Sequence, residues 1–187
     1  MADQLTRDLA ATLRSARIET GLSVNALADH SGVSRAMIAK IERGEAQPTA
    51  ALLGRLAGAL GLTLSELFAR TEGESPRLAR LADQTVWVDP ETGYRRRSVS
   101  PAGGPVQLVE VELPAGAKVS YPADSYAVAH HQIYVLDGRL RFHEGDLRHD
   151  LGAGDCLELG APVPCAYENP AGRACRYLVV LSPRRAR

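Results

Sequence analysis

The 187-residue sequence lacks the features that mark exported and membrane-spanning proteins. No apolar run is long enough to cross a bilayer, and the N-terminus lacks the apolar core of a signal peptide. The three cysteines, Cys156, Cys165 and Cys175, include no Cys-x-x-Cys pair, and an odd number of thiols is typical of a reducing compartment. We therefore expect a cytoplasmic protein with free thiols and no membrane partner.

The sequence also lacks a net charge, which many nucleic-acid-binding proteins have. It contains 22 Lys and Arg against 22 Asp and Glu, and residues 1–70 hold eight basic and seven acidic residues. A DNA-binding face would therefore depend on where the charges lie, because their total provides no attraction. A hydrophobic content of 45% is that of an ordinary globular protein.

Two hydrophobic periods divide the chain. Residues 5–69 are rich in Ala and Leu, with apolar positions three and four apart, which is typical of helices. From residue 106 onward every second position is often apolar, and Gly and Pro separate the short runs, which is typical of antiparallel strands. The predicted fold class is multidomain α plus β: a helical domain at 1–70, a linker and lead-in strand segment at 71–104, and a strand-rich domain at 105–187.

Five helices are expected in the first half of the chain. They are Leu5–Thr20, Val24–Ser31, a helix from Ser34 to about Arg43, a helix from Thr49 to Leu60, and a short helix containing Leu67 and Phe68. Ser23, Ser34 and Ser65 are the predicted N-caps of three of them, because a hydroxyl there accepts a hydrogen bond from a free backbone N–H.

Residues 22–44 have the spacing that two short crossing helices require. Leu27, Val33 and Ile38 provide inner faces, and Gly32 permits the turn. The stretch resembles the Cro and phage-repressor type (XRE family) of helix-turn-helix, and residues 5–69 together resemble the lambda-repressor-like five-helix bundle of that family.

The resemblance implies a double-stranded DNA operator as partner. In this family the second helix of the motif enters the major groove with its N-terminal residues at base edges. Arg35, Ala36 and Lys40 occupy the base-reading positions, and Ser34 and Arg43 match positions near phosphates. Met37 would share the same exposed face.

The resemblance also assigns a structural pair and shows one departure. Arg17 and Glu42 match an ion pair that joins the first helix of the bundle to the third. The family often has Gln at the start of the second helix, where it contacts phosphate, but this chain has Val24 there. Asn25 is the residue that could replace that contact.

The second half is expected to contain many short strands. Predicted strands are Val106–Leu113, Gln132–Leu136, Leu140–His143, Cys156–Leu159 and Arg176–Leu181, with a hairpin turn at Asp137-Gly138. Ile133–Leu140 and Leu151–Asn169 resemble the two conserved segments of a cupin, which implies an all-β jelly-roll barrel that serves as a sensor or a dimer interface.

The cupin resemblance places a pocket at Asp124, Tyr126, His131 and Cys165. A metal-binding cupin has two histidines and a glutamate in its first segment and a histidine in its second. In this chain the resemblance places Asp124 and Tyr126 at the two histidine positions, His131 at the glutamate position and Cys165 at the last histidine position. Asp, His and Cys can each bind zinc. We therefore keep four alternatives. They are a metal-free cavity for a small organic effector, a zinc or other divalent-metal site that uses His131 and Cys165 with Asp124 or Tyr126, a reactive Cys165 thiol activated by His131, and a purely structural barrel.

The remaining His, Cys and Arg residues are expected to be structural or exposed. The predictions are an outward-facing His130, surface positions for His143 and His149, packed thiols at Cys156 and Cys175, and a solvated charge run at Arg95–Arg97.

The sequence as a whole predicts a homodimeric, sequence-specific transcriptional regulator that is not an enzyme and whose cupin domain senses a small-molecule effector. We expect residues 76–187 alone to bind that effector. The alternatives are a cupin isomerase or oxygenase with an appended DNA-binding domain, and a repressor that senses nothing and uses its barrel only to dimerise.

Overall fold

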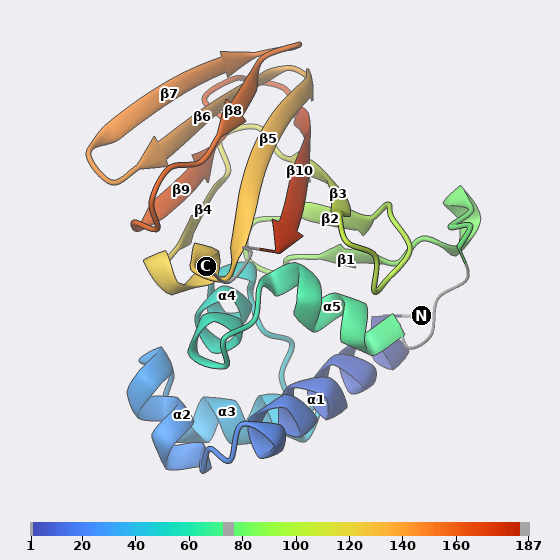
Figure 1. Cartoon of the computed structure of the whole chain (residues 1–187), viewed down its shortest axis with the longest axis vertical. Helices are drawn as coiled ribbons and strands as arrows, with labels where there is room; N and C mark the ends of the chain where they lie inside the picture. The colour runs from blue at the N-terminus through green and yellow to red at the C-terminus, as the bar shows by residue number, and fades with distance from the viewer. Residues whose placement is uncertain (1, 73–76, 184–187) are drawn as a thin grey trace.

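The computed structural model describes residues 2–72 and 77–183. Five helices form one end of the molecule and two β-sheets form the other (Figure 1). We call residues 2–72 the helical domain and residues 77–183 the strand domain. The predicted α plus β organisation is confirmed.

The helical domain has the five helices that the hydrophobic period predicts. They are α1 (Ala2–Glu19), α2 (Val24–Ser31), α3 (Arg35–Glu42), α4 (Ala50–Ala59) and α5 (Leu64–Glu72). The side chains of Ser23, Ser34 and Thr49 accept from backbone N–H groups at the starts of α2, α3 and α4. Gly32 ends α2 with a φ of 65°, which lets the chain turn sharply into α3.

The predicted cap of the fifth helix is wrong. Thr63, not Ser65, caps α5: its hydroxyl accepts from the N–H of Glu66 at 3.0 Å, and the Glu66 carboxylate accepts from the N–H of Thr63 at 2.6 Å. This reciprocal capping box starts the helix earlier than the sequence suggests. Ser65 is therefore left free to turn inward, where it is buried.

The strand domain consists of two antiparallel sheets. Its strands are β1 (Val86–Val88), β2 (Arg95–Ser98), β3 (Gln107–Leu113), β4 (Lys118–Tyr121), β5 (Ala129–Asp137), β6 (Arg139–Glu144), β7 (Leu147–Gly152), β8 (Cys156–Glu158), β9 (Cys165–Glu168) and β10 (Cys175–Pro183), with short 3₁₀ turns η1 (Leu81–Asp83) and η2 (Ala123–Tyr126). One sheet has the order β1-β2-β3-β10-β5-β8 and the other β4-β9-β6-β7. Over the described residues the strands pair as these two sheets and not as one closed barrel.

The predicted hairpin at Asp137-Gly138 is also wrong. The strands on either side of this turn, β5 and β6, belong to different sheets. Gly138 has a φ of 88°, and a Cβ there would lie 3.0 Å from the Cα of Cys175. Glycine is therefore required at this position because the chain passes close to β10 as it crosses from one sheet to the other.

Aromatic rings fill the space between the two sheets. The rings of Tyr167 and Tyr177 stack with centroids 5.5 Å apart, and Phe142 meets Tyr167 edge-on at 4.9 Å. Tyr177 lies on the six-stranded sheet, whereas Phe142 and Tyr167 lie on the other. These contacts hold the inner faces of the sheets together.

The helical domain packs directly on the strand domain, and one continuous core contains residues of both. The ring of Phe68 in α5 lies 5.6 Å from that of Trp87 in β1. The buried Asp89 carboxylate accepts from the N–H of Ala50 at 2.9 Å, at the N-terminus of α4 where a negative charge is stabilising. The β1–β2 hairpin, which falls in the segment that the sequence presents as linker and lead-in strand, is the surface on which the helices dock.

The described residues contain no single helix that is long and apolar enough to cross a membrane. Taken together, α4 and α5 reach that length and composition, but they are bent by 92° at the break between them.

Gly54 provides a test of how closely the two domains pack. A Cβ at Gly54 would overlap the ring of Tyr121 and lie 3.4 Å from the Oγ of Ser125. In an open helix Gly→Ala stabilises by up to about 1 kcal/mol, whereas forcing an extra methyl into a packed core costs about 1–3 kcal/mol. We therefore expect Gly54→Ala to lower the free energy of unfolding measured in urea.

Gly172→Ala is the matched control, because a Cβ there has no atom within 4 Å. It should leave the midpoint of unfolding nearly unchanged. A Gly54→Ala protein as stable as the Gly172→Ala protein would contradict the tight contact between α4 and β4.

Candidate DNA-reading face and cavity

The recognition helix α3 is held against α1 by an ion pair. The Nε of Arg17 lies 2.6 Å from Glu42 Oε1 and its Nη2 lies 2.9 Å from Oε2, while Nη1 donates to the carbonyl of Leu22 at 2.9 Å. Both side chains are largely buried, so this two-point contact fixes the orientation of α3 more strongly than a surface pair could. The predicted structural role of Arg17 and Glu42 is confirmed.

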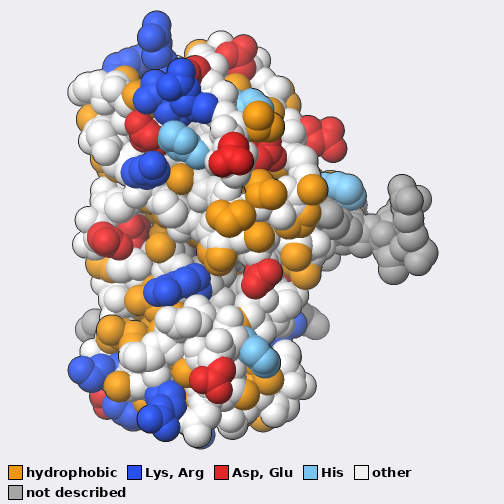
Figure 2. Space-filling view, turned by 90° about the vertical axis from the view of Figure 1, so that its left-hand side faces the viewer, with side chains coloured by type: hydrophobic (Ala, Val, Ile, Leu, Met, Phe, Trp, Pro, Cys, Tyr) orange, Lys and Arg blue, Asp and Glu red, His pale blue; other side chains and the backbone are white. Residues whose placement is uncertain are grey.

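The predicted DNA-reading residues share the solvent-facing side of α3. Ile38 and Ile41 point into the core and are 0% and 1% exposed. The residues on the other side are exposed: Ser34, Arg35, Ala36, Met37, Lys40 and Arg43. Lys and Arg side chains gather, among acidic ones, at the lower, helical end of the molecule in Figure 2.

Two contacts tie basic residues of this face to neighbours. Arg35 Nη1 donates to Asn25 Oδ1 at 3.4 Å, so Asn25, at the position that the sequence suggests for a phosphate contact, lies beside one of the predicted base-reading residues. Arg43 forms two hydrogen bonds with the exposed carboxylate of Glu45, each 2.6 Å long. Arg43 would have to leave Glu45 to reach a phosphate.

A cavity lies inside the strand domain, next to the helical domain. We call it the tyrosine cavity, because Tyr94, Tyr121, Tyr126, Tyr167 and Tyr177 line it. Apolar residues of β3, β4 and β10 form much of the remaining wall, and Leu64 and Ser65 of α5 complete it. The space open to the centre of a water molecule is about 50 Å³. The DNA-reading domain thus contributes directly to the wall of the cavity.

Arg96 is the residue that the sequence analysis missed. It is 3% exposed, its Nη2 donates to Ser65 Oγ at 2.6 Å, and its guanidinium lies 4.5 Å from the centre of the Phe68 ring. The prediction of a solvated charge run is therefore wrong for Arg96, although Arg95 is exposed and Arg97 pairs with Glu110 at the half-buried outer face. Alternation along β2 was the signal, because it places every second side chain on the inner face.

The tyrosine hydroxyls around the cavity remain protonated. Burial raises the pKa of Tyr94, Tyr121 and Tyr167 above the ordinary value, and the same holds for the two other tyrosines. The positive charge of Arg96 partly offsets this rise in pKa at Tyr94 and Tyr121. Each hydroxyl can therefore donate a hydrogen bond at neutral pH.

The structure brings together three of the four predicted pocket residues. Tyr126 and His131 line the tyrosine cavity, with ring centroids 4.7 Å apart. Cys165 lines a smaller neighbouring cavity of about 10 Å³, whose wall also includes Tyr126 and His131. Asp124 is exposed on η2, beside Gly58 of α4, and lines neither cavity.

The donor set at this place does not fit a zinc centre. Within residues 2–72 and 77–183, no three His, Cys, Asp or Glu side chains are grouped as metal ligands. His131 Nδ1 lies 3.1 Å from the carbonyl of Ala129, and Asp124 is too far outside to complete a set with His131 and Cys165. Structural and catalytic zinc sites use at least three protein ligands.

The cysteines differ in exposure from what the sequence predicts. Cys175 is buried as expected, but Cys156 is exposed, because its side chain points outward from the short edge strand β8. Burial raises the pKa of the Cys165 thiol to about 12. A protonated, buried thiol is a poor nucleophile, so the geometry does not favour the reactive-thiol alternative.

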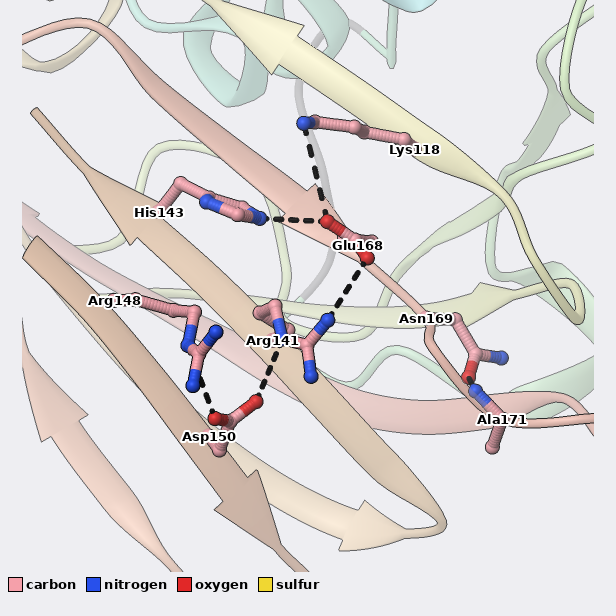
Figure 3. A network of polar contacts seen from close by, with 8 residues as sticks. All are labelled: Lys118, Arg141, His143, Arg148, Asp150, Glu168, Asn169 and Ala171. Carbon is pink, nitrogen blue, oxygen red and sulfur yellow. Dashed lines mark hydrogen bonds and ion pairs between the residues drawn. The ribbon is translucent and has the colours of Figure 1, made fainter. Parts of the chain in front are cut away.

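The outer face of the four-stranded sheet carries a separate polar network (Figure 3). Glu168 contacts His143 at 2.6 Å, Arg141 at 3.3 Å and Lys118 at 3.9 Å, and Arg141 also contacts Asp150 at 2.7 Å. Hydrogen bonding to His143 and the nearby cations lower the pKa of Glu168. These residues alternate with the inward-facing core and lie outside the tyrosine cavity, which supports the surface position predicted for His143.

Comparison with known proteins identifies both domains. Residues 13–67 match the helix-turn-helix family model, and residues 109–181 match the cupin domain model. The chain joins a helix-turn-helix domain to a cupin domain. This is the domain composition of an HTH-type transcriptional regulator.

Two named regulators align with most of this chain. The HTH-type transcriptional regulator SutR of Escherichia coli (strain K12) is 27% identical over 173 residues, which cover 89% of this chain and 90% of SutR. The crystal structure of an HTH_3 family transcriptional regulator from Vibrio cholerae superimposes with a TM-score of 0.80 at 23% identity, covering 99% of this chain and all of the other. Hydroxypropylphosphonic acid epoxidase from S. wedmorenis is 17% identical and covers 95% of this chain and 97% of its own, but its TM-score of 0.46 is too low to support an inference.

The thiols of the regulator provide a test of the packing around Cys165. At pH 8 a thiol with a pKa of about 12 is ionised in only about one molecule in ten thousand. We expect a thiol reagent to modify Cys156 quickly in the native protein, and Cys165 and Cys175 only slowly, as followed by mass spectrometry. Cys156→Ser should remove the fast phase and still show two thiols in denaturant. Fast labelling of Cys165 in that variant would revive the reactive-thiol alternative.

Proposed function

We propose that this chain is a sequence-specific DNA-binding regulator whose tyrosine cavity holds a small-molecule effector that controls operator binding. The observation that supports it most is the shared wall of the cavity, where Leu64 and Ser65 of α5 complete a pocket of the strand domain. A molecule in that pocket would touch the DNA-reading domain itself.

The helical domain and the cavity belong to one packed unit. Phe68 of α5 contacts Trp87, Ser125 Oγ donates to the carbonyl of Gly54 in α4 at 3.0 Å, and Ala50 bonds to Asp89. An effector can act only by binding one arrangement of the domains better than another. Here each alternative arrangement would change contacts in the wall of the cavity.

This arrangement changes one expectation from the sequence. Residues 76–187 alone would lack Leu64 and Ser65, and would expose the faces of Trp87 and Arg96 that pack on α5. The proposal therefore places the complete effector site in the full chain and not in the isolated strand domain.

A homodimer remains part of the proposal. Two reading heads of this kind meet half-sites about 34–36 Å apart on one face of the duplex. A pair of chains that brings both α3 helices to one face of DNA would give a palindromic operator, and light scattering on the free protein measures the dimer directly.

The alternatives stay distinct from this proposal. A cupin isomerase or oxygenase would need a set of metal ligands or catalytic groups, and His131 and Cys165 do not form one with Asp124. A barrel used only to dimerise would need no space at its centre, whereas this one contains a cavity lined by hydroxyl groups. The assignments as a non-enzyme and as a cytoplasmic protein stay predictions.

Substitution of Arg35 tests the proposed DNA-reading face. Removing a bidentate contact to a guanine costs about 1–3 kcal/mol, or roughly 5- to 150-fold in affinity. We expect Arg35→Ala to weaken binding by that factor in a gel-shift assay on duplex DNA selected by the wild-type protein from a random library.

Arg80→Ala is the charge-matched control, because Arg80 is exposed in the strand domain, outside α3. It should bind the selected DNA as wild type does. Equal affinities of Arg35→Ala and wild type, with both proteins folded by circular dichroism, would contradict the assigned reading role.

A cavity-filling variant tests the effector control whatever the effector is. We expect a low-molecular-mass cell extract to change the operator affinity of the wild-type protein. Val111 is 1% exposed and lines the cavity, so Val111→Phe should occupy the space and abolish the response. Val106→Phe, at a position that is 44% exposed, should keep it. A full response from a folded Val111→Phe protein would rule out the tyrosine cavity as the effector site.

A further inference from the structure

The polar groups that line the tyrosine cavity are hydroxyls, the imidazole of His131 and one cation, the guanidinium of Arg96. The guanidinium of Arg96 and the rings of Tyr94 and Tyr121 all lie in the wall of the cavity. Against the rise that burial causes, the charge of Arg96 lowers the pKa of both tyrosines, whereas that of the buried Asp89 raises the pKa of Tyr94. The described residues that line the cavity include no Asp and no Glu. A ligand group that accepts hydrogen bonds and carries a negative charge is the natural complement of such a wall.

The rest of the wall is apolar. Val109, Val111, Val119, Val179 and Leu181 line the cavity among the polar groups. Val111 pairs directly with Arg96 across strands β2 and β3. These side chains provide no partner for a second polar group but favour contact with a short hydrocarbon chain. The cavity wall thus combines hydrogen-bonding groups with apolar side chains, as expected for a ligand with one charged head and one small tail.

The size of the cavity limits the ligand. A volume of about 50 Å³ for water centres corresponds to about four water molecules, since each requires roughly 10–15 Å³ in this measure. A molecule of about four to six non-hydrogen atoms fits such a space, whereas a sugar or a nucleotide does not.

We propose that the effector of this regulator is a small aliphatic monocarboxylate, with its carboxylate on Arg96, Tyr94 and Tyr121 and its hydrocarbon tail among the valines. This inference rests on the proposed function, in which the tyrosine cavity is the effector site. The planar fork of a guanidinium matches the two oxygens of a carboxylate, which distinguishes this ligand from a neutral amide of the same shape.

The same guanidinium connects the proposed ligand to the helical domain. Arg96 donates to Ser65 in α5 and lies over the ring of Phe68 in the same helix. A carboxylate that binds Arg96 competes for its N–H groups and moves its fork relative to α5. Ligand binding in the cavity would thereby change the hydrogen bond between Arg96 and Ser65, and so the contact between the strand domain and α5.

Binding of matched ligand pairs to the full-length wild-type protein tests the chemical class. Such small ligands bind no more tightly than on the order of micromolar, so ligand-detected NMR is the appropriate measurement. Acetate, propanoate and butanoate should bind at least about ten-fold more tightly than acetamide, propanamide and butanamide. Equal binding of acids and amides, or binding of neither, would overturn the carboxylate assignment.

Two variants of Arg96 locate the binding group. Arg96→Met keeps most of the side-chain volume but loses the charge, and Arg96→Lys keeps the charge but loses the fork. Both should weaken propanoate binding at least about ten-fold, and Arg95→Met, at an exposed position of the same strand, should not. If Arg96→Met fails to fold, Arg96→Lys and the acid–amide comparison decide the question. A folded Arg96→Lys protein with wild-type affinity would overturn it.

Operator binding tests the connection through α5. Propanoate should shift the operator dissociation constant of the wild-type protein, and propanamide should not. With propanoate at saturation for each protein, Ser65→Ala should lose at least half of that shift, whereas Ser120→Ala, at an exposed serine of β4, should keep all of it. An unchanged shift in Ser65→Ala would overturn the connection through α5.

These outcomes separate this inference from the proposed function. Failure of every carboxylate, together with a response to the cell extract that Val111→Phe abolishes, would reject the carboxylate and keep the effector-controlled regulator. Binding of propanoate to the cavity without any change in operator affinity would keep the ligand and reject the control of DNA binding.

Discussion

The contact between Arg96 and helix α5 is the interaction on which the rest of the structure depends. One guanidinium joins a strand of the cupin sheet, the wall of the cavity and the DNA-reading domain. Removing a charge of this kind from water costs several kcal/mol. The hydrogen bond to Ser65 and the ring of Phe68 offset part of that cost, and both partners come from the helical domain. Separating the domains would therefore remove both contacts from the buried charge.

The docking of the helical domain follows from small residues as much as from polar contacts. Gly54 and Gly58 let α4 approach Tyr121 and η2 so closely that a methyl group at either place would press on its neighbours. Asp89 then meets the N-terminus of α4 from the strand side. Contacts made by α4, by α5 and by Gln47, whose Nε2 donates to the carbonyl of Val88, hold the helical domain against the strand domain. In this geometry a change in the cavity has a short path to the helix bundle that carries α3.

Short-range features of this fold can be predicted from the sequence, whereas most contacts between distant residues cannot. Helix starts at Ser23 and Ser34 and the pair Arg17–Glu42 were predictable, because caps and a family motif are local or fixed in register. Ser65 was misassigned as a cap because Thr63 and Glu66 form the capping box two positions earlier. Gly138 was misread because a glycine turn has the same composition whether the next strand pairs back or crosses to another sheet.

Local sequence patterns predict only part of the residues that line the pocket. Tyr126, His131 and Cys165 were placed near one another from the cupin segments, and the structure puts them around two adjoining cavities. Asp124 was included by alignment alone and lies at the surface. Arg96 is absent from the predicted pocket because a run of three arginines is typical of a solvent-exposed segment. In the structure the alternation of side chains along β2 buries the middle arginine.

The sequence by itself determined the two domains, the register of the reading helix and the side of α3 that faces solvent. These features depend on hydrophobic periods of 3.6 and 2 and on caps, which act over a few residues. Only the tertiary structure decided that Arg96 is buried, that Ser65 faces it and that the helical domain completes the cavity. Those facts depend on contacts between residues 31 positions apart, which are made only after both domains have folded and packed together.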